Sequence, residues 1–247
     1  MASTADHSHS PLSQFEVYSI FDFQPGGYNL SFTNSSAAMV ATVSIIALFL
    51  TFTVKKRSLI PNRAQVISET IYEFVATLLQ DTVGKDGRRF FPFVFTIFMF
   101  VLIGNMIGMI PYSFTFTSHI IVTFALAAVV FLGVTILGLV KHKMHFFSFF
   151  IIPGLPFYML PLLLPIEIIS YLSRPISLSV RLFANMLAGH TLLKVFAGFV
   201  VSLGFAGVFP LAFVIALTGL EILIAFLQAY VFAILTCLYI NDALHLH

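Results

Sequence analysis

Two uninterrupted apolar stretches in the C-terminal half of the chain restrict its fold more than any other feature. Residues 158–201 form a stretch of about 44 residues without a polar loop, and residues 206–240 form a second one of about 35. As helices they would be roughly 66 and 52 Å long, whereas the hydrocarbon core of a bilayer is about 30 Å thick. Each stretch is therefore either broken inside a membrane or strongly tilted in it.

Strong tilt is the better explanation. Prolines at positions 161, 165 and 175 could kink the first stretch, but it offers no hydrophilic point at which a broken helix could turn back. The sequence therefore predicts a hairpin of two long membrane helices that turns at residues 202–207. Each helix is expected to lie more than about 45° from the membrane normal, because tilts near 20° recover little of the length mismatch.

The composition agrees with a membrane protein. Of the 247 residues, 59% are hydrophobic and only 9% are charged, whereas soluble domains have about 25% charged residues. The length allows roughly five to seven membrane helices. We therefore expect an all-α integral membrane protein with a single membrane domain. A basic patch interleaved with aromatic residues is missing from the sequence, so no nucleic-acid partner is expected.

Three upright spans are expected before the hairpin. They fall at residues 37–54, 90–111 and 119–140, where apolar runs have about the length of a bilayer core. In the second of these, Gly104 and Gly108 are four residues apart, a spacing that lets another helix approach closely.

One further helix is expected to lie in the membrane interface. Between residues 61 and 83, apolar and polar side chains fall on opposite helical faces, which is typical of an amphipathic surface helix. Asn62 is placed to cap the start of this helix.

The distribution of Lys and Arg predicts the orientation of the chain. These residues are concentrated at 55–89 and 141–145, whereas residues 1–36 and 112–119 contain none. By the positive-inside rule, the tail 1–36 and the turn 112–119 face outside, and the basic segments face the cytoplasm or a mitochondrial matrix. The first apolar run follows a polar tail, so no cleavable signal peptide is expected.

Charged side chains inside the hairpin are few and costly. A charge at the centre of a membrane helix costs about 2.5–3.5 kcal/mol, so such groups are expected to face a cavity, a partner or an ion pathway. The charged residues are Glu167, Arg174, Arg181, Lys194 and Glu221, and the polar residues Asn185, His190 and Gln228 accompany them.

Seven-residue spacing places these groups on two polar stripes. Glu167, Arg174 and Arg181 are seven apart in the first stretch, and Glu221 and Gln228 are seven apart in the second.

The predicted orientation also orders the polar groups by depth. Glu167 falls toward the cytoplasmic side, Arg181 near the middle, and His190 and Glu221 toward the outer side. This order is typical of two water-accessible half-channels that do not meet.

Simpler explanations exist for several of these residues. Lys194 and Arg174 could extend their charges to the interface. His190 could be a hydrogen-bonded packing residue, and Asn185 and Gln228 could join helices for about 0.6 kcal/mol.

Other polar residues predict no chemistry. Asp242, His245 and His247 are expected to form a solvated tail. His142 and His145 have no cysteine or carboxylate partners at ligand spacing, so no metal site is expected. Nucleotide-binding loops and nucleophile motifs are missing from the sequence, so neither bond-making catalysis nor a cofactor is expected.

Three sequence motifs resemble those of one family. Residues 167–190 read EIISYLSRPISLSVRLFANMLAGH, residues 105–111 read NMIGMIP, and Glu221 is followed seven positions later by Gln228. Together they closely resemble the a subunits of F-type ATP synthases, and the resemblance covers nearly the whole chain. Residues 10–16 are similar to the start of mitochondrial and related bacterial members.

The resemblance implies a function. Such a subunit is a non-catalytic stator that forms two proton half-channels against a rotating ring of c subunits and couples proton flow to ATP synthesis. Its arginine matching Arg181 faces the essential carboxylate of the ring. Some bacterial members carry Glu at the position of His190 and His at that of Glu221, whereas here the two are exchanged, as in mitochondrial members.

The resemblance also implies partners, location and site residues. The partners are the c ring, peripheral-stalk b subunits, other membrane subunits, lipid and protons, in a bacterial inner membrane or, less favoured, a mitochondrial one. The proton-path residues are Arg181, Glu221, His190, Glu167, Asn185 and Gln228, with Arg174, Ser170 and Lys194 as secondary candidates.

Two other functions fit the residues alone. A secondary transporter could use Arg181 to bind an anion, but such proteins contain inverted repeats, and the sequence shows none. A structural scaffold would not need five buried charges.

Overall fold

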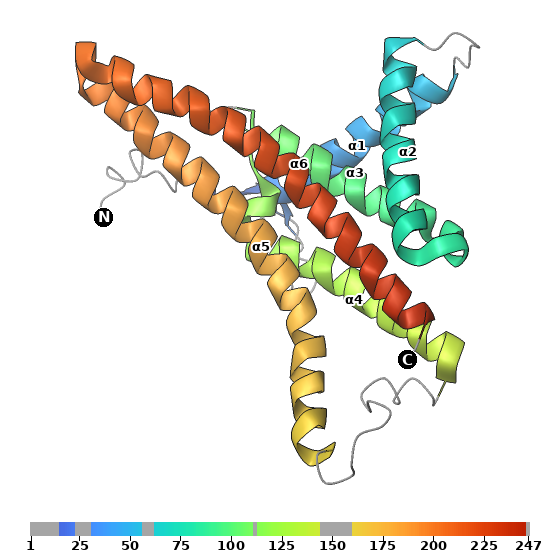
Figure 1. Cartoon of the computed structure of the whole chain (residues 1–247). Coiled ribbons are helices and arrows are strands. Elements are labelled where there is room, and N and C mark those ends of the chain that lie inside the picture. The colour runs from blue at the N-terminus through green and yellow to red at the C-terminus, as the bar shows by residue number, and fades with distance from the viewer. Residues whose placement is uncertain (1–14, 23–30, 56–61, 111–112, 144–159, 246–247) are drawn as a thin grey trace. The chain divides into compact units, whose positions relative to one another are not determined.

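The computed structural model describes residues 15–22, 31–55, 62–110, 113–143 and 160–245 (Figure 1). Within these residues, five helices are long and apolar enough to cross a membrane. The chain is therefore an all-α integral membrane protein, as expected. Some predicted features lie outside the described residues: most of the tail 1–36, the ends of the predicted helices at 61, 111 and 158–159, and residues His145 and His247.

Six helices account for most of the described chain. They are α1 (Asn34–Lys55), α2 (Arg63–Val83), α3 (Phe91–Gly108), α4 (Ile120–His142), α5 (Leu160–Ser202) and α6 (Val208–Leu244), with short 3-10 turns η4 (Gly84–Phe90), η5 (Phe116–Ser118) and η8 (Gly204–Gly207). Helices thus occupy each position at which the sequence predicts one. Their placement in a membrane, including the tilt of α5 and α6, stays a prediction.

Two short strands precede the first helix. β1 (Ser19–Phe21) pairs antiparallel with β2 (Phe32–Thr33), so that Ser19 lies opposite Thr33. The Asn34 side chain donates a hydrogen bond to the carbonyl oxygen of Glu16 at 3.0 Å. Strands of three and two residues are too short for an alternating pattern to reveal them, which is why the sequence did not predict them.

Helix α2 has clear signals at both ends. The Asn62 side chain accepts a hydrogen bond from the Arg63 N–H at 2.8 Å, as the capping prediction requires. The helix ends at Gly84, whose φ of 76° favours glycine and whose N–H donates to the carbonyl oxygen of Gln80. Its buried side chains, Val75, Leu79 and Val83, recur every four residues and form one apolar face.

Helix α5 is continuous over 43 residues although Pro165 and Pro175 lie inside it. Each proline removes one helical N–H donor, a loss that membrane helices tolerate. The alternative of two separately looped spans between residues 160 and 202 is therefore wrong.

A tight turn joins α5 to α6 at the predicted place (Figure 1). A Cβ at Gly207 would overlap the carbonyl oxygen of Val200, so only glycine fits there. The rings of Phe196 and Phe213 stack 5.8 Å apart across the hairpin.

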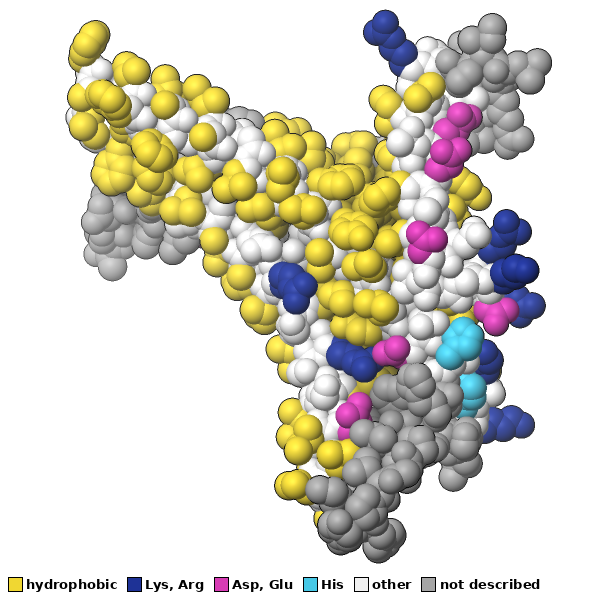
Figure 2. All heavy atoms as spheres, viewed as in Figure 1, with side chains coloured by type: hydrophobic (Ala, Val, Ile, Leu, Met, Phe, Trp, Pro, Cys, Tyr) yellow, Lys and Arg dark blue, Asp and Glu magenta, His cyan; other side chains and the backbone are white. Residues whose placement is uncertain are grey.

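The outer surface of the hairpin near its turn is strongly apolar. Figure 2 shows hydrophobic side chains over this region, and Phe205 and Phe209 expose 99% and 78% of their surface. Apolar exposure on this scale is typical of a surface that contacts lipid or another membrane protein.

The chain divides into two compact units. The described residues within 1–57, 99–119 and 182–229 form the first unit, and those within 58–98, 120–181 and 230–247 form the second. Helices α3, α5 and α6 contribute to both, and each unit is considered by itself below.

Candidate functional site

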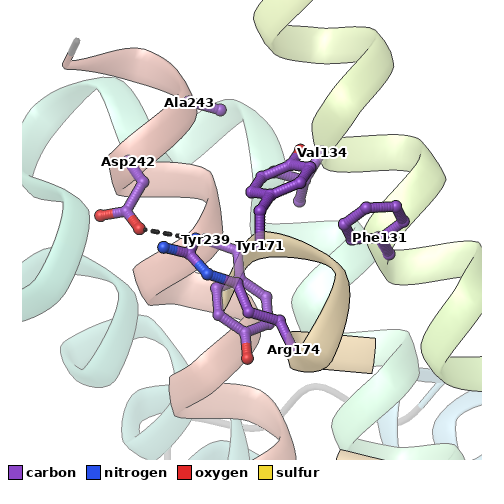
Figure 3. Close-up of a pocket in the computed structure, with 7 residues that line it drawn as sticks. All are labelled: Phe131, Val134, Tyr171, Arg174, Tyr239, Asp242 and Ala243. Carbon is purple, nitrogen blue, oxygen red and sulfur yellow. Dashed lines mark hydrogen bonds and ion pairs between the residues drawn. The ribbon is translucent and has the colours of Figure 1, made fainter. Parts of the chain in front are cut away.

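An ion pair joins α5 to α6 in the second unit. Nη1 of Arg174 lies 3.0 Å from Oδ2 of Asp242 (Figure 3), and the Arg174 guanidinium carbon lies 5.4 and 5.2 Å from the ring centres of Tyr171 and Tyr239. Both contacts are within the range of cation–π attraction. A cavity of about 20 Å³ adjoins this pair, with room for one water molecule.

The ion pair corrects one expectation. Asp242 does not belong to a solvated tail, because α6 continues to Leu244 and the carboxylate, although 41% exposed, is paired with Arg174. The extension of Arg174 to the membrane interface stays a prediction, since pairing with a partly exposed carboxylate is compatible with it.

Arg181 has different surroundings from Arg174, although both belong to the same stripe. Its side chain is exposed on α5, and it makes no hydrogen bond or ion pair with another residue that the structure describes. Glu167 is half-exposed and also lacks such a partner within the described ranges. The carbonyl oxygen of Ser170 accepts a hydrogen bond from Ser173 at 2.7 Å.

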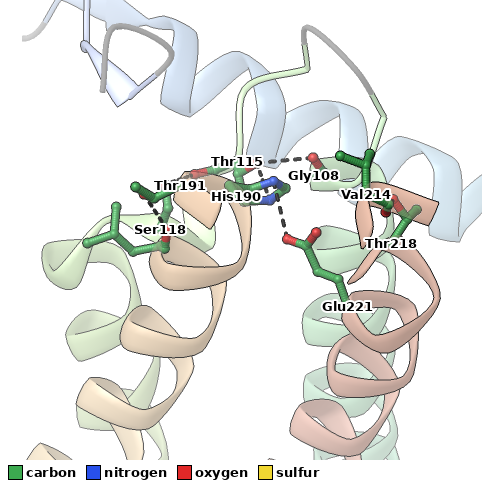
Figure 4. A network of polar contacts seen from close by, with 9 residues as sticks. Gly108, Thr115, Ser118, His190, Thr191, Val214, Thr218 and Glu221 are labelled. Carbon is green, nitrogen blue, oxygen red and sulfur yellow. Dashed lines mark hydrogen bonds and ion pairs between the residues drawn. The ribbon is translucent and has the colours of Figure 1, made fainter. Parts of the chain in front are cut away.

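A buried acid–base pair lies in the first unit. Nδ1 of His190 on α5 is 3.3 Å from Oε1 of Glu221 on α6 (Figure 4), and the two residues expose only 8% and 3% of their surface. Both carboxylate oxygens of Glu221 are buried, and neither has a hydrogen-bond partner among the described residues, so the contact with His190 is an ion-pair contact. Burying a polar atom without a partner is costly, so this site is built for more than packing.

Thr115 contacts the second ring nitrogen of His190. Its hydroxyl donates to the carbonyl oxygen of Gly108 at 3.3 Å and lies 3.3 Å from Nε2 of His190. A hydroxyl has one proton, so while Thr115 donates to Gly108, its oxygen accepts from a protonated Nε2. The other ring nitrogen, Nδ1, then faces Oε1 of Glu221.

Close packing brings the pair together. A Cβ at Gly189 would lie 2.7 Å from Oε1 of Glu221, so the carboxylate rests against the α5 backbone. On α3, a Cβ at Gly104 or Gly108 would overlap the side chain of Phe116 or Thr115. The two glycines therefore admit side chains of the following turn rather than another helix, contrary to expectation.

Amides connect the helices one to two turns from this pair. Nδ2 of Asn185 donates to Oε1 of Gln228 at 3.1 Å, and Nδ2 of Asn105 donates to the carbonyl oxygen of Ala225 at 3.4 Å. Gln228 is 3% exposed, and its Nε2 has no hydrogen-bond partner among the described residues. Lys194, nine positions after Asn185 on α5, is half-buried.

Comparison with known proteins identifies the family. The family model described as ATP synthase A chain matches residues 36–241. A Pelagibacter ubique protein named ATP synthase subunit a is 58% identical over 240 residues, covering 96% of this chain and 98% of its own. A Rhodospirillum rubrum protein of the same name is 55% identical, covering 97% and 100%. The chain belongs to the ATP synthase A chain family.

Membership of the ATP synthase A chain family confirms the resemblance that the sequence motifs indicated. The chain is a multi-pass membrane protein of the proton-translocating membrane sector, and it works with other ATP synthase subunits in ATP synthesis and ion transport. The structure brings together His190 with Glu221 and Asn185 with Gln228.

Sequence reasoning missed some residues of the site in this ATP synthase family member. Asp242 follows Gln228 by 14 positions, so the seven-residue stripe of α6 could have identified it. Thr115 and Gly189 offered no such signal, because their roles depend on contacts between distant segments.

Proposed function

We propose that the chain is the non-catalytic stator subunit that forms two proton half-channels against a rotating ring of c subunits. The observation that carries this proposal is the exposed Arg181 on a membrane helix, without an anionic partner among the described residues. A guanidinium at such a position is costly unless a partner molecule covers it. A carboxylate on the ring would supply that partner.

The chemistry of arginine suits this role. A ring carboxylate that faces lipid is neutral, because burial disfavours its charged form, and it can ionise opposite Arg181. Arginine does not lose its proton, so it cannot pass protons directly between the half-channels. Protons must then travel with the ring. Each charge that crosses the membrane supplies about 2.3 kcal/mol per 100 mV for rotation.

The buried pair would serve the outer half-channel. A proton can move between Nδ1 of His190 and Oε1 of Glu221 without a change in net charge, while Thr115 holds the other ring nitrogen. The hydrogen bond between Asn185 and Gln228 would keep α5 and α6 together on the way to Arg181. Glu167 would serve the cytoplasmic half-channel.

The remaining parts of the proposal concern partners and location. The c ring, the peripheral-stalk b subunits, lipid and protons are the partners, and a bacterial inner membrane is the location. The relatives described above are bacterial, which supports this choice. The two other functions considered from the residues alone, a secondary transporter and a structural scaffold, gain no support from the matched family.

Arg181→Ala tests the proposal. The variant complex should assemble but lose ATP-driven proton pumping in membrane vesicles, whereas Arg63→Ala, which removes an exposed cation from α2, should retain most of it. Pumping by Arg181→Ala at the Arg63→Ala level would reject the proposed role.

Single cysteines at positions 167, 190 and 221 test the two half-channels. We expect positions 190 and 221 to react with polar reagents added from outside and position 167 with reagents added from the cytoplasm. The opposite result would invert the proposed orientation.

A further inference from the structure

A pocket of about 700 Å³ lies in the second unit, where α2, η4 and the first turn of α3 meet. Its volume is in the range of sites that hold small molecules, about 300–1,000 Å³. Its lining includes Tyr72, Leu79, Lys85, Arg88 and Phe91. None of the lining residues belongs to the proposed proton path.

One side of the pocket is a fixed apolar wall. The Tyr72 ring lies 4.5 Å from that of Phe91, which stacks in turn on Phe95 at 5.4 Å. Leu79, which is 3% exposed, also lines the pocket. An acyl chain could lie along these side chains without disturbing them.

The other side of the pocket is positively charged. Lys85 and Arg88 are exposed, and neither makes an ion pair with a residue in the described parts of the chain. Asp81 and Asp86 are close in sequence, yet they do not line the pocket. The two cations are therefore available to an anion.

The position of the pocket along the chain places it at the membrane surface. The charged side chains of η4 belong outside the hydrocarbon core, whereas α3 is an apolar helix that crosses it. Because η4 leads directly into α3, we expect the pocket to lie between the headgroup level and the first acyl carbons.

We propose that this pocket binds one anionic phospholipid, with its phosphate at Lys85 and Arg88 and an acyl chain against Tyr72, Leu79 and Phe91. Two available cations beside an aromatic wall match both parts of such a lipid. The orientation proposed above places the pocket in the cytoplasmic leaflet, which is the anionic one. A free phosphate ion would leave the apolar wall unused.

The sequence allows a direct test, because it contains no tryptophan. A Tyr72→Trp substitution gives the full chain a single fluorophore in the pocket. The protein is placed in phosphatidylcholine discs that contain a small fraction of lipid with brominated acyl chains, either phosphatidylglycerol or phosphatidylcholine. Brominated phosphatidylglycerol should quench the fluorescence more strongly. A Leu132→Trp substitution on the exposed face of α4 should show no such preference.

Charge variants then test the two cations. In the Tyr72→Trp background, Lys85→Gln with Arg88→Gln should lower the preference for phosphatidylglycerol by about 25-fold, since each cation near anionic lipid contributes about fivefold. Arg89→Gln removes a neighbouring exposed cation that does not line the pocket, and it should change little. In Tyr72→Trp alone, raising the salt concentration should weaken the preference for phosphatidylglycerol, because salt screens the attraction between the cations and the phosphate.

Several results would overturn the proposal. Equal quenching by the two brominated lipids, or a preference that persists in the double variant or at high salt, would exclude a phosphate site at Lys85 and Arg88. An equal loss in Arg89→Gln would indicate a general surface effect. In the assembled complex, a fluorophore that brominated lipid cannot reach would assign the pocket to a protein partner instead.

Discussion

A single methyl group at Gly189 tests whether the His190–Glu221 pair lies on the proton path. In a Gly189→Ala variant, the new Cβ would lie 2.7 Å from Oε1 and 3.0 Å from Cδ of Glu221, where ordinary contacts begin at 3.4 Å. The carboxylate must therefore move by roughly 0.7 Å to reach a normal van der Waals distance. It begins 3.3 Å from Nδ1 of His190, so the pair loses its contact if the carboxylate moves away from the ring.

The rest of the protein should tolerate this change. Alanine favours a helix over glycine by about 1 kcal/mol, and the displaced atoms are the end of a flexible side chain. A misplacement of about 1 Å at a reacting group can lower a rate by about 100-fold. We therefore expect proton flux to fall by roughly 10- to 100-fold while the amount of assembled complex stays the same.

The assay is passive proton flux through the membrane sector, in vesicles stripped of the soluble ATPase and driven by a potassium diffusion potential. The matched controls are Gly198→Ala on α5 and Gly219→Ala on α6, because a Cβ at either position has no neighbouring atom within 4 Å. Both controls should conduct like the unmodified protein. If Gly189→Ala conducts as well as they do, the His190–Glu221 contact does not limit proton flow.

Three further predictions follow from individual contacts. Thr115→Val removes the hydroxyl that contacts Nε2 of His190, and the buried N–H left without a partner should cost about 1–3 kcal/mol of stability and slow proton flux in the same vesicle assay. Thr115→Ser retains the hydroxyl, so its stability and proton flux should match those of the unmodified protein. Asp242→Asn breaks a partly exposed ion pair with Arg174, so a double-mutant cycle with Arg174→Gln, read out by thermal unfolding in detergent, should give a coupling of only about 0.2–1 kcal/mol. Burial, with the ring stacked on Phe114, lowers the pKa of His119 from 6.5. The folded protein therefore binds fewer protons at this residue than the unfolded chain, and its stability should fall as the pH drops below 6.5. Thermal unfolding of His119→Gln should show a weaker dependence on pH in this range.

The helices were predictable because each is an apolar or amphipathic run of sufficient length. The cap at Asn62 and the turn after Ser202 were predictable for a related reason, since both depend on residues adjacent in sequence. The end of α6 was not, because the charged Asp242 interrupts the apolar run and its contact with Arg174, 68 positions away, cannot be read from the sequence.

The candidate site was predictable as a set of residues but not as a set of contacts. Seven-residue spacing placed Glu221 and Gln228 on one face, and the high cost of charge in a membrane identified them as unusual. Spacing within one helix cannot specify which residue of another helix lies opposite. The contacts of Thr115 with His190, and of Gly189 with Glu221, therefore became visible only in the structure.

Pro175 gives α5 an uneven stiffness close to Arg181. The proline has no N–H, so the carbonyl oxygen of Tyr171 receives no helical hydrogen bond from position 175. On one side of this gap, Arg174 is anchored by Asp242, whereas Arg181 lies two turns beyond without such an anchor. The missing hydrogen bond is expected to make α5 easier to bend between Arg174 and Arg181. In the proposed contact with a turning ring, such bending would let the arginine follow successive carboxylates as they pass, while Arg174 stays paired with Asp242.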